Sequence, residues 1–319
     1  MNIILITPAP PRSRVGNRAT ATRWARILEQ LGHHVYIDTD YHGEQADLMI
    51  ALHAWRSAHA IEQFATRHPR KPLIVAITGT DAYRFLHSDP ETTLKSLHHA
   101  DQLVGLHDLI ANSLPADQHH KMNVIRQSAL PITRHDPYRR YFHIAVLGHL
   151  REEKDPLRPA LAARLLPASS RIHIHHYGKA YNEDWAQAAT EEMSVNSRYT
   201  WHGEVAHHRV RQVYQRSNLL VLPSRMEGGA NVISEAVVAG LPVVASNIEG
   251  SIGLLGAEYA GYYPVEDEHA LCELLLRAEQ DKEFYRELEA HCLVLQAKFT
   301  PQSEQEAWRQ LLVKMGLQE

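Results

Sequence analysis

The sequence predicts an α/β protein with two parallel-sheet domains in tandem. Its 319 residues are enough for two domains that each bury a core. In both halves, short apolar runs alternate with helix-length amphipathic segments, the pattern of parallel strands joined by helical crossovers. Each half therefore reads as a Rossmann-like domain. We expect strands at 3–7, 35–37, 48–52, 73–78, 103–106 and 124–125, and then at 144–147, 172–177, 219–222 and 243–245.

The first crossover helix is expected over 18–31. Trp24, Leu28 and Leu31 share one helical face there, and Gly32 follows as a C-terminal stop. Three further helical stretches begin at about Asp267 and close the chain.

A polar, charged segment at 133–141 predicts the linker between the domains. It places an N-terminal domain at 1–135 and a second domain at 141–300, and the last helix, 301–319, is expected to pack back on the N-terminal domain. In facing domains of this class, the carboxyl ends of the strands bracket a crevice that binds ligands.

Composition excludes several classes of protein. No apolar stretch approaches the roughly 20 residues that cross a bilayer, so we expect a soluble, cytoplasmic protein that begins without a secretory signal. A formal net charge of −4 argues against nucleic acid or an anionic membrane as the partner. The two cysteines, Cys272 and Cys292, form neither a zinc motif nor a disulfide framework.

The strongest candidate site follows the strand at 219–222. Two glycines precede a helix that Asn231 can cap, so backbone N–H groups at a positive helix end are available to a diphosphate. Glu227 in the loop and Glu235 one turn into the helix can both accept from sugar hydroxyls. The candidate donor-binding residues here are Glu227, Gly228, Gly229, Ala230, Asn231 and Glu235.

A second segment, 148–156, directly follows the strand that opens the second domain. Arg151 and Lys154 are candidate catalytic cations, because fixed positive charge would stabilise a leaving diphosphate. His149 lies beside them as a donor-binding candidate. Taken alone, charged residues at the start of a helix are as readily explained by solvation.

Strand ends of the first half supply a candidate acceptor pocket. The loop after the first strand carries arginines and a glycine, Gly16, that lets the backbone approach a ligand. Capping and loop solvation remain an equal alternative for each residue taken singly. The acceptor candidates are Arg12, Arg14, Asn17, Arg18, His53, Arg56, Thr80 and Asp81.

Metal sites are not expected. Asp38-Thr39-Asp40 has the D-x-D spacing of a divalent-metal motif, but such short acidic patterns are common in loops. The run containing His173, His175 and His176 alternates as a strand would and lacks further ligands. We therefore expect a metal-independent protein with no cofactor.

The segment 223–243 resembles the donor-site signature of retaining GT-B glycosyltransferases, with Pro-Ser, Glu-x7-Glu and Gly-x-Pro-Val. The resemblance implies the GT-B fold, two Rossmann-like domains facing a central cleft. It assigns Glu227, a third catalytic candidate, to the transferred sugar and Glu235 to the ribose. The segment 148–154 is similar to the family's G-R-x4-K pattern, with Lys154 in the lysine place and His149 where arginine is common.

More narrowly, the chain resembles the selenosugar synthases of selenoneine biosynthesis, for which His149 and the Gly-Gly-Ala loop are the usual pattern. The matching pieces lie at 7–11, 16–18, 51–54, 78–81, 148–151, 154–156, 227–231 and 253–256. This resemblance implies transfer of N-acetylglucosamine or glucose from its UDP conjugate to selenophosphate, which gives a 1-selenosugar and UDP. A GT-B enzyme with another small-molecule or lipid acceptor, and a non-catalytic UDP-sugar-binding protein, stay open as alternatives.

Overall fold

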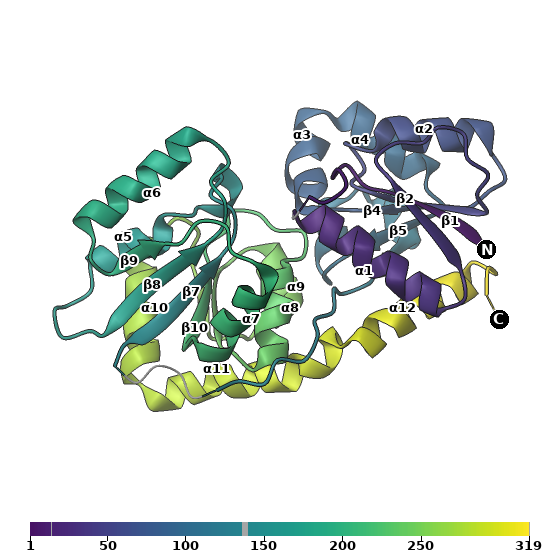
Figure 1. Cartoon of the computed structure of the whole chain (residues 1–319). Helices are drawn as coiled ribbons and strands as arrows, with labels where there is room; N and C mark the ends of the chain where they lie inside the picture. The colour runs from purple at the N-terminus through teal and green to yellow at the C-terminus, as the bar shows by residue number, and fades with distance from the viewer. Residues whose placement is uncertain (14, 136–139, 319) are drawn as a thin grey trace. The chain divides into compact units, whose positions relative to one another are not determined.

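The computed structural model describes residues 1–13, 15–135 and 140–318. Its internal contacts divide the chain into two compact units (Figure 1). The first unit comprises 1–127, 227–229 and 301–319, and the second comprises 128–226 and 230–300.

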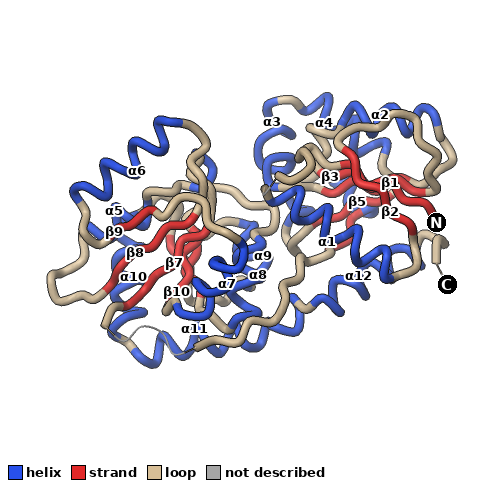
Figure 2. The backbone as a smooth tube through the Cα atoms, viewed as in Figure 1, coloured by secondary structure: helices blue, strands red, loops and turns tan. Residues whose placement is uncertain are grey.

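A parallel sheet forms the centre of the first unit (Figure 2). It has six strands, in the order β2-β1-β3-β4-β5-β6. Its strands are β1 (Asn2–Ile6), β2 (His34–Asp38), β3 (Leu48–Leu52), β4 (Leu73–Ala76), β5 (Gln102–Gly105) and β6 (Met122–Val124). Its helices are α1 (Gly16–Gln30), α2 (Ala58–Arg67), α3 (Leu86–Ser88), α4 (Pro90–His99) and α12 (Pro301–Lys314), with a π-helix, η1 (Asp81–Phe85), and 3-10 turns η2 (Ile110–Ser113) and η3 (Ala116–Lys121).

Both faces of this sheet are covered, because alternate residues of each buried strand point to opposite sides. On β1, Ile4 and Ile6 belong to a cluster with α2 and α4, whereas Ile3 and Leu5 belong to a cluster with α1 and α12. Apolar residues at every position of β3 and β4 follow from this two-sided burial.

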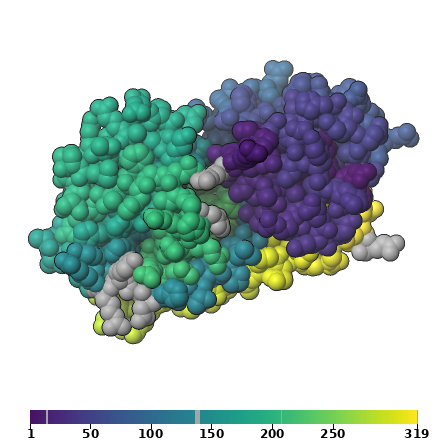
Figure 3. Space-filling model, viewed as in Figure 1, coloured from purple at the N-terminus to yellow at the C-terminus, as the bar shows by residue number. Residues whose placement is uncertain are grey.

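The C-terminal helix α12 is fastened to α1 by buried contacts. Trp308 packs edge-on against Trp24 with ring centroids 4.9 Å apart. The carboxylate of Glu304, 1% exposed, accepts from Trp24 Nε1 at 2.8 Å and from Arg23 Nε at 2.9 Å. In the space-filling view, the yellow C-terminal end accordingly lies against the purple N-terminal residues (Figure 3).

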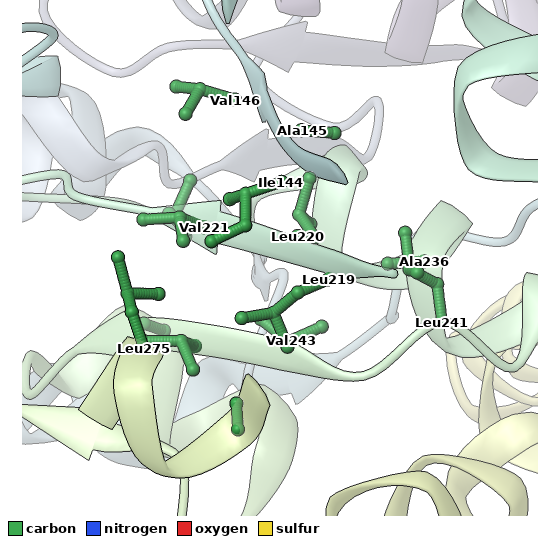
Figure 4. Close-up of a cluster of buried hydrophobic side chains, with 14 of the residues drawn as sticks. Ile144, Ala145, Val146, Leu219, Leu220, Val221, Ala236, Leu241, Val243 and Leu275 are labelled. Carbon is green, nitrogen blue, oxygen red and sulfur yellow. The ribbon is translucent and has the colours of Figure 1, made fainter. Parts of the chain in front are cut away.

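The second unit has its own six-stranded parallel sheet, in the order β12-β11-β10-β7-β8-β9. Its strands are β7 (Phe142–Leu147), β8 (Ile172–Tyr177), β9 (Tyr199–Trp201), β10 (Leu219–Leu222), β11 (Val243–Ser246) and β12 (Tyr262–Tyr263). Its helices are α5 (Arg158–Arg164), α6 (Glu183–Val195), α7 (His207–Arg216), α8 (Asn231–Ala239), α9 (Glu249–Leu255), α10 (Glu268–Gln280) and α11 (Lys282–Leu295), with 3-10 turns η4 (Glu152–Lys154) and η5 (Gln296–Phe299). Side chains of β7, β10 and β11 pack with those of α8 and α10 into one core (Figure 4).

The sequence-based prediction of an α/β fold with two parallel sheets is confirmed. Two short strands, β9 and β12, were not expected. The predicted linker, 133–141, includes residues 136–139, which lie outside the described part of the chain. The structural division falls earlier, after Gln127, since Arg134 donates to Gly240 O at 2.8 Å and to Glu289 Oε1 at 2.9 Å within the second unit.

None of the helices among the described residues is long and apolar enough to cross a membrane.

Candidate functional site

The strand order of the second sheet indicates where that unit would bind a ligand. β7 lies between β10 and β8, so the chain crosses over in opposite directions on its two sides. In open parallel sheets, ligands bind outside the carboxyl ends of the strands at such a switch point. The carboxyl ends of β7 and β10 lead directly into 148–157 and 223–230, so the two predicted donor segments lie at neighbouring strand ends.

The segment after β7 presents two cations and a histidine. His149, Arg151 and Lys154 are all partly exposed, and Arg151 Nη1 pairs with Glu153 Oε1 at 3.1 Å. The Nε of Arg151 is buried and has no hydrogen-bond partner among the described residues. A buried, unsatisfied donor at a strand end is a suitable contact for an anionic ligand.

His149 adds a neutral imidazole rather than a third cation. Burial lowers its pKa, and the neighbouring charges of Arg151, Lys154 and Lys179 lower it further. Its Nδ1 accepts from the backbone N–H of Lys179 at 3.1 Å, which leaves the proton of the neutral ring on Nε2. His149 can therefore donate a hydrogen bond without changing the charge of the site.

Close backbone packing fixes the β7 segment against β8. A Cβ on Gly178 would lie 1.8 Å from the carbonyl oxygen of Gly148, so only glycine fits there. Buried His176 approaches the same oxygen with Nε2 at 3.1 Å. Gly178 was not identified from the sequence, and His176 was noted there only as part of the histidine run discounted as a metal site.

Arg225 joins the two donor segments and was also missed from the sequence. Its backbone N–H donates to Glu153 O at 2.9 Å, and its Nη2 pairs with Glu266 Oε1 at 2.7 Å. The segment after β10 is therefore tied to the one after β7. Its position in the same loop, two residues before Glu227, could have identified Arg225 from the sequence.

The helix that follows the glycines is α8. Its N-cap is Ala230 with no side-chain cap, and Asn231 is its first residue, so the expected capping by Asn231 is corrected. Gly229 has φ +133°, which favours glycine. A half-buried carboxylate, Glu235, accepts from Tyr214 Oη at 2.6 Å. Glu227 is buried at 8% exposed, and the contacts group Glu227–Gly229 with the first unit.

The first sheet has its own switch point at β1, between β2 and β3. The loop after β1 contains exposed Arg12 in the left-handed region, at φ +65°. Gly16, Asn17 and Arg18 form the first turn of α1, and Arg18 Nη1 is buried without a partner among the described residues. The predicted acceptor residue Arg14 lies outside the described residues.

The ends of β3 and β4 bring together the remaining acceptor candidates, but only some of them face solvent. Arg56 is exposed and Thr80 is partly exposed, whereas His53 and Asp81 are 2% and 0% exposed. His53 Nδ1 lies 2.6 Å from Asp81 Oδ1, and Thr80 Oγ1 lies 3.0 Å from His53 Nε2. Asp81 therefore supports His53 from inside the fold.

Two aromatic residues complete this cluster and were not predicted. Trp55 stacks on Phe85 with ring centroids 4.0 Å apart and an interplanar angle of 1°. The guanidinium of Arg56 lies 5.9 Å from the centre of the Phe85 ring. Phe85 ends η1, a π-helix, an element that is rare and frequent at functional sites.

The motifs discounted as metal sites have local partners. Asp38 accepts from the N–H of Thr39 at 2.6 Å, and Asp40 pairs with His59. His175 stacks between His143 and His202. Among residues 1–13, 15–135 and 140–318, no group of three or more His, Cys, Asp or Glu side chains could hold a metal ion.

Comparison with solved structures identifies the fold. Over 99% of both chains, this protein superimposes on a sucrose-phosphate synthase from Thermosynechococcus elongatus with a TM-score of 0.79 at 16% identity. Anabaena HepE in complex with UDP and glucose gives a TM-score of 0.76 at 15% identity, over 98% of this chain and 100% of that one. The chain has the GT-B glycosyltransferase fold.

Residues 134–291, just under half of the chain, match the family model of glycosyl transferases group 1. The matched range lies within the second unit apart from 227–229. The matched range contains both segments at the β7–β10 switch point. Strand order alone marks these two segments as a ligand site, and the match adds that they are similar to glycosyltransferase sequences.

Curated relatives match over shorter stretches. The putative teichuronic acid biosynthesis glycosyltransferase TuaC of Bacillus subtilis is 31% identical over 80 residues, which cover 25% of this chain and 21% of that protein. An Escherichia coli UDP-Gal:alpha-D-GlcNAc-diphosphoundecaprenol alpha-1,3-galactosyltransferase is 29% identical over 154 residues, 45% of this chain and 38% of that protein. This chain thus matches well under half the length of either relative.

Proposed function

We propose that the protein is a glycosyltransferase that uses UDP-N-acetylglucosamine or UDP-glucose as donor and selenophosphate as acceptor. The observation that carries the donor half is that the segments 148–157 and 223–230 follow neighbouring strands at one switch point, inside the range that matches the group 1 model. Relatives support the choice of nucleotide, since HepE is solved with UDP and the Escherichia coli enzyme is named for a UDP-sugar. The selenium acceptor rests on the motif resemblance across residues 7–256.

In the proposed reaction, selenium attacks the anomeric carbon, the bond from that carbon to the diphosphate oxygen breaks, and UDP leaves with the electron pair. Water then cleaves the selenium–phosphorus bond and releases phosphate. The selenium atom is already anionic, so attack needs little help from a general base. Catalysis consists of positioning and of stabilising the charge that develops on the leaving diphosphate.

The donor roles follow from the site. Arg151, Lys154 and the N-terminus of α8 supply positive charge to the diphosphate. His149 donates through Nε2. Glu235, oriented by Tyr214, accepts from the ribose, and Glu227 accepts from hydroxyls of the transferred sugar.

The test incubates purified protein with each UDP-sugar, with and without selenophosphate, and follows UDP and selenium-containing products by mass spectrometry. We expect selenophosphate-dependent UDP release with a matching 1-selenosugar, and its loss in Lys154→Ala and Glu227→Ala. Arg171→Ala is the matched control, because Arg171 precedes the amino end of β8, whereas the candidate segments follow the carboxyl ends of the strands. Chelation of divalent metals should leave the rate unchanged.

Other outcomes separate the alternatives. If the protein binds a UDP-sugar but turns over only with a thiol or lipid acceptor, that acceptor would replace selenophosphate in the proposal. Binding without turnover for any acceptor would make the protein a UDP-sugar-binding module and would contradict the enzymatic proposal.

A further inference from the structure

Polar contacts at the ends of β3 and β4 link Asp81 to His53 and His53 to Arg56. Asp81 Oδ2 accepts from the backbone N–H and the hydroxyl of Thr78, each at 2.9 Å, and Asp81 Oδ1 accepts from the N–H of Trp55 at 3.0 Å. The carboxylate is therefore fixed before it meets His53 Nδ1 at 2.6 Å. Because a carboxylate only accepts, this shorter contact favours a proton on Nδ1 of His53, while the backbone N–H of Arg56 lies 3.2 Å from the same nitrogen.

The opposite nitrogen of the same ring meets an arginine. Arg56 Nε donates to His53 Nε2 at 3.2 Å, which requires a neutral imidazole with a lone pair on Nε2. The tautomer that Asp81 selects is thus the one that Arg56 needs. At 2% exposed, His53 is itself buried beneath these neighbours and offers little surface to a ligand.

Arg56 is held at two points. His53 fixes its Nε, and the Phe85 ring, stacked on Trp55, faces its guanidinium carbon at 5.9 Å. Within the part of the chain that the structure describes, no hydrogen bond or ion pair is made by its two terminal nitrogens. They form the end of the guanidinium that binds carboxylate or phosphate in a bidentate manner.

Backbone strain accompanies this arrangement. His53 has φ +76°, the left-handed region, which a bulky residue enters at a cost. Asp81 begins the π-helix η1. Strain at a strand end is retained when the surrounding structure over-determines the residue, and such positions cluster at ligand sites.

We propose that Asp81 and His53 are positioning residues that orient Arg56 to bind the phosphate group of the acceptor. The inference rests on the proposed function for the identity of the acceptor, but the phosphate subsite itself can be tested without turnover. Fixing the guanidinium before binding removes part of the entropy cost of ordering a long side chain. Asp81 and His53 thus act through Arg56, which alone of the three meets the ligand.

The experiment measures binding of inorganic phosphate to the full chain by calorimetry, with no UDP-sugar present. We expect Arg56→Ala to weaken binding at least about 10-fold and His53→Asn to weaken it about 3- to 10-fold. Asparagine tolerates the left-handed backbone, so His53→Asn tests the ring and not the turn. The control, Arg70→Ala, removes an exposed arginine that precedes β4, away from the carboxyl ends.

A double-mutant cycle separates positioning from general damage. In the Arg56→Ala background, His53→Asn should cause no further loss of phosphate affinity. The same is expected in the Arg56→Lys background, because lysine has no Nε–H at that place to meet His53. Asp81→Asn should reproduce the loss seen in His53→Asn. If it does not fold, as judged by thermal denaturation, the His53–Arg56 cycle stands alone.

Additive losses in the cycle, or wild-type phosphate affinity in Arg56→Ala, would overturn the proposal. So would weaker UDP binding in Arg56→Ala with phosphate affinity unchanged, because that would put the guanidinium on the donor. Failure to form a selenosugar would contradict only the proposed function, since phosphate binding is measured independently of it.

Discussion

Removal of the Glu304 carboxylate should loosen the C-terminal helix from the first unit. In Glu304→Ala, the indole N–H of Trp24 and the Nε–H of Arg23 lose their acceptor, at 2.8 and 2.9 Å respectively. Trp24 is fully buried, and the side chain of Arg23 is 21% exposed. Water can therefore reach the cation in part but cannot replace the partner of the indole.

The size of the effect follows from those exposures. Removing one partner of a buried ion pair costs about 3–5 kcal/mol, and partial solvation of Arg23 favours the lower end, about 3 kcal/mol. For a unit of roughly 150 residues, each kcal/mol lowers Tm by about 2–4 °C. The transition of the first unit should therefore fall by about 6–12 °C.

Differential scanning calorimetry measures this shift. The matched control is Glu306→Ala on the same helix, because Glu306 pairs with Arg309 on the surface and exposed pairs contribute little. Its Tm should equal that of the wild type. Equal values of Tm for the two variants would refute the reasoning that α12 is fastened through Glu304.

Three further predictions concern the second unit. Tyr214→Phe removes the hydroxyl that donates to Glu235 at 2.6 Å and should weaken UDP binding about 5- to 10-fold in calorimetry; unchanged affinity would contradict the orienting role. Gly178→Ala places a methyl group against the Gly148 carbonyl oxygen and should lower UDP affinity and Tm together, whereas a wild-type Tm would show that the segment is not tightly packed. Burial lowers the pKa of His176 to about 4, so the unfolded chain binds more protons between pH 6.5 and about 4. Stability should fall as the pH drops through that window, and His176→Gln should flatten the fall in urea midpoints; an equal fall in both proteins would contradict it.

The fold could be predicted from the sequence because its signal is local. Each buried strand is a short apolar run bounded by polar turns, as β3 and β10 show. The two unpredicted strands lack such a run, since β12 is only Tyr262–Tyr263 and β9 mixes Thr200 with two aromatic residues.

The segments of the candidate site could also be predicted from the sequence, because glycines and cations directly after a predicted strand indicate a ligand site. Their supporting residues could not. Glu304 meets Trp24 across 280 positions, and Tyr214 meets Glu235 through the packing of α7 on α8. Such contacts depend on how helices dock, for which neither side chain carries a local pattern.

The His53–Asp81 pair shows the same limit in a different form. Both residues were identified as strand-end candidates, but the left-handed backbone of His53 and the burial of Asp81 arise only once β3 and β4 are paired. Sequence position alone could not separate the exposed residue, Arg56, from the two buried ones.

Selenophosphate-dependent release of UDP from UDP-N-acetylglucosamine or UDP-glucose, followed by mass spectrometry, tests the central claim most directly. The account predicts that UDP and a 1-selenosugar of matching mass appear together, and that both are lost in Lys154→Ala but kept in Arg171→Ala. UDP-sugar binding with no selenium-containing product from a folded wild-type protein would contradict it.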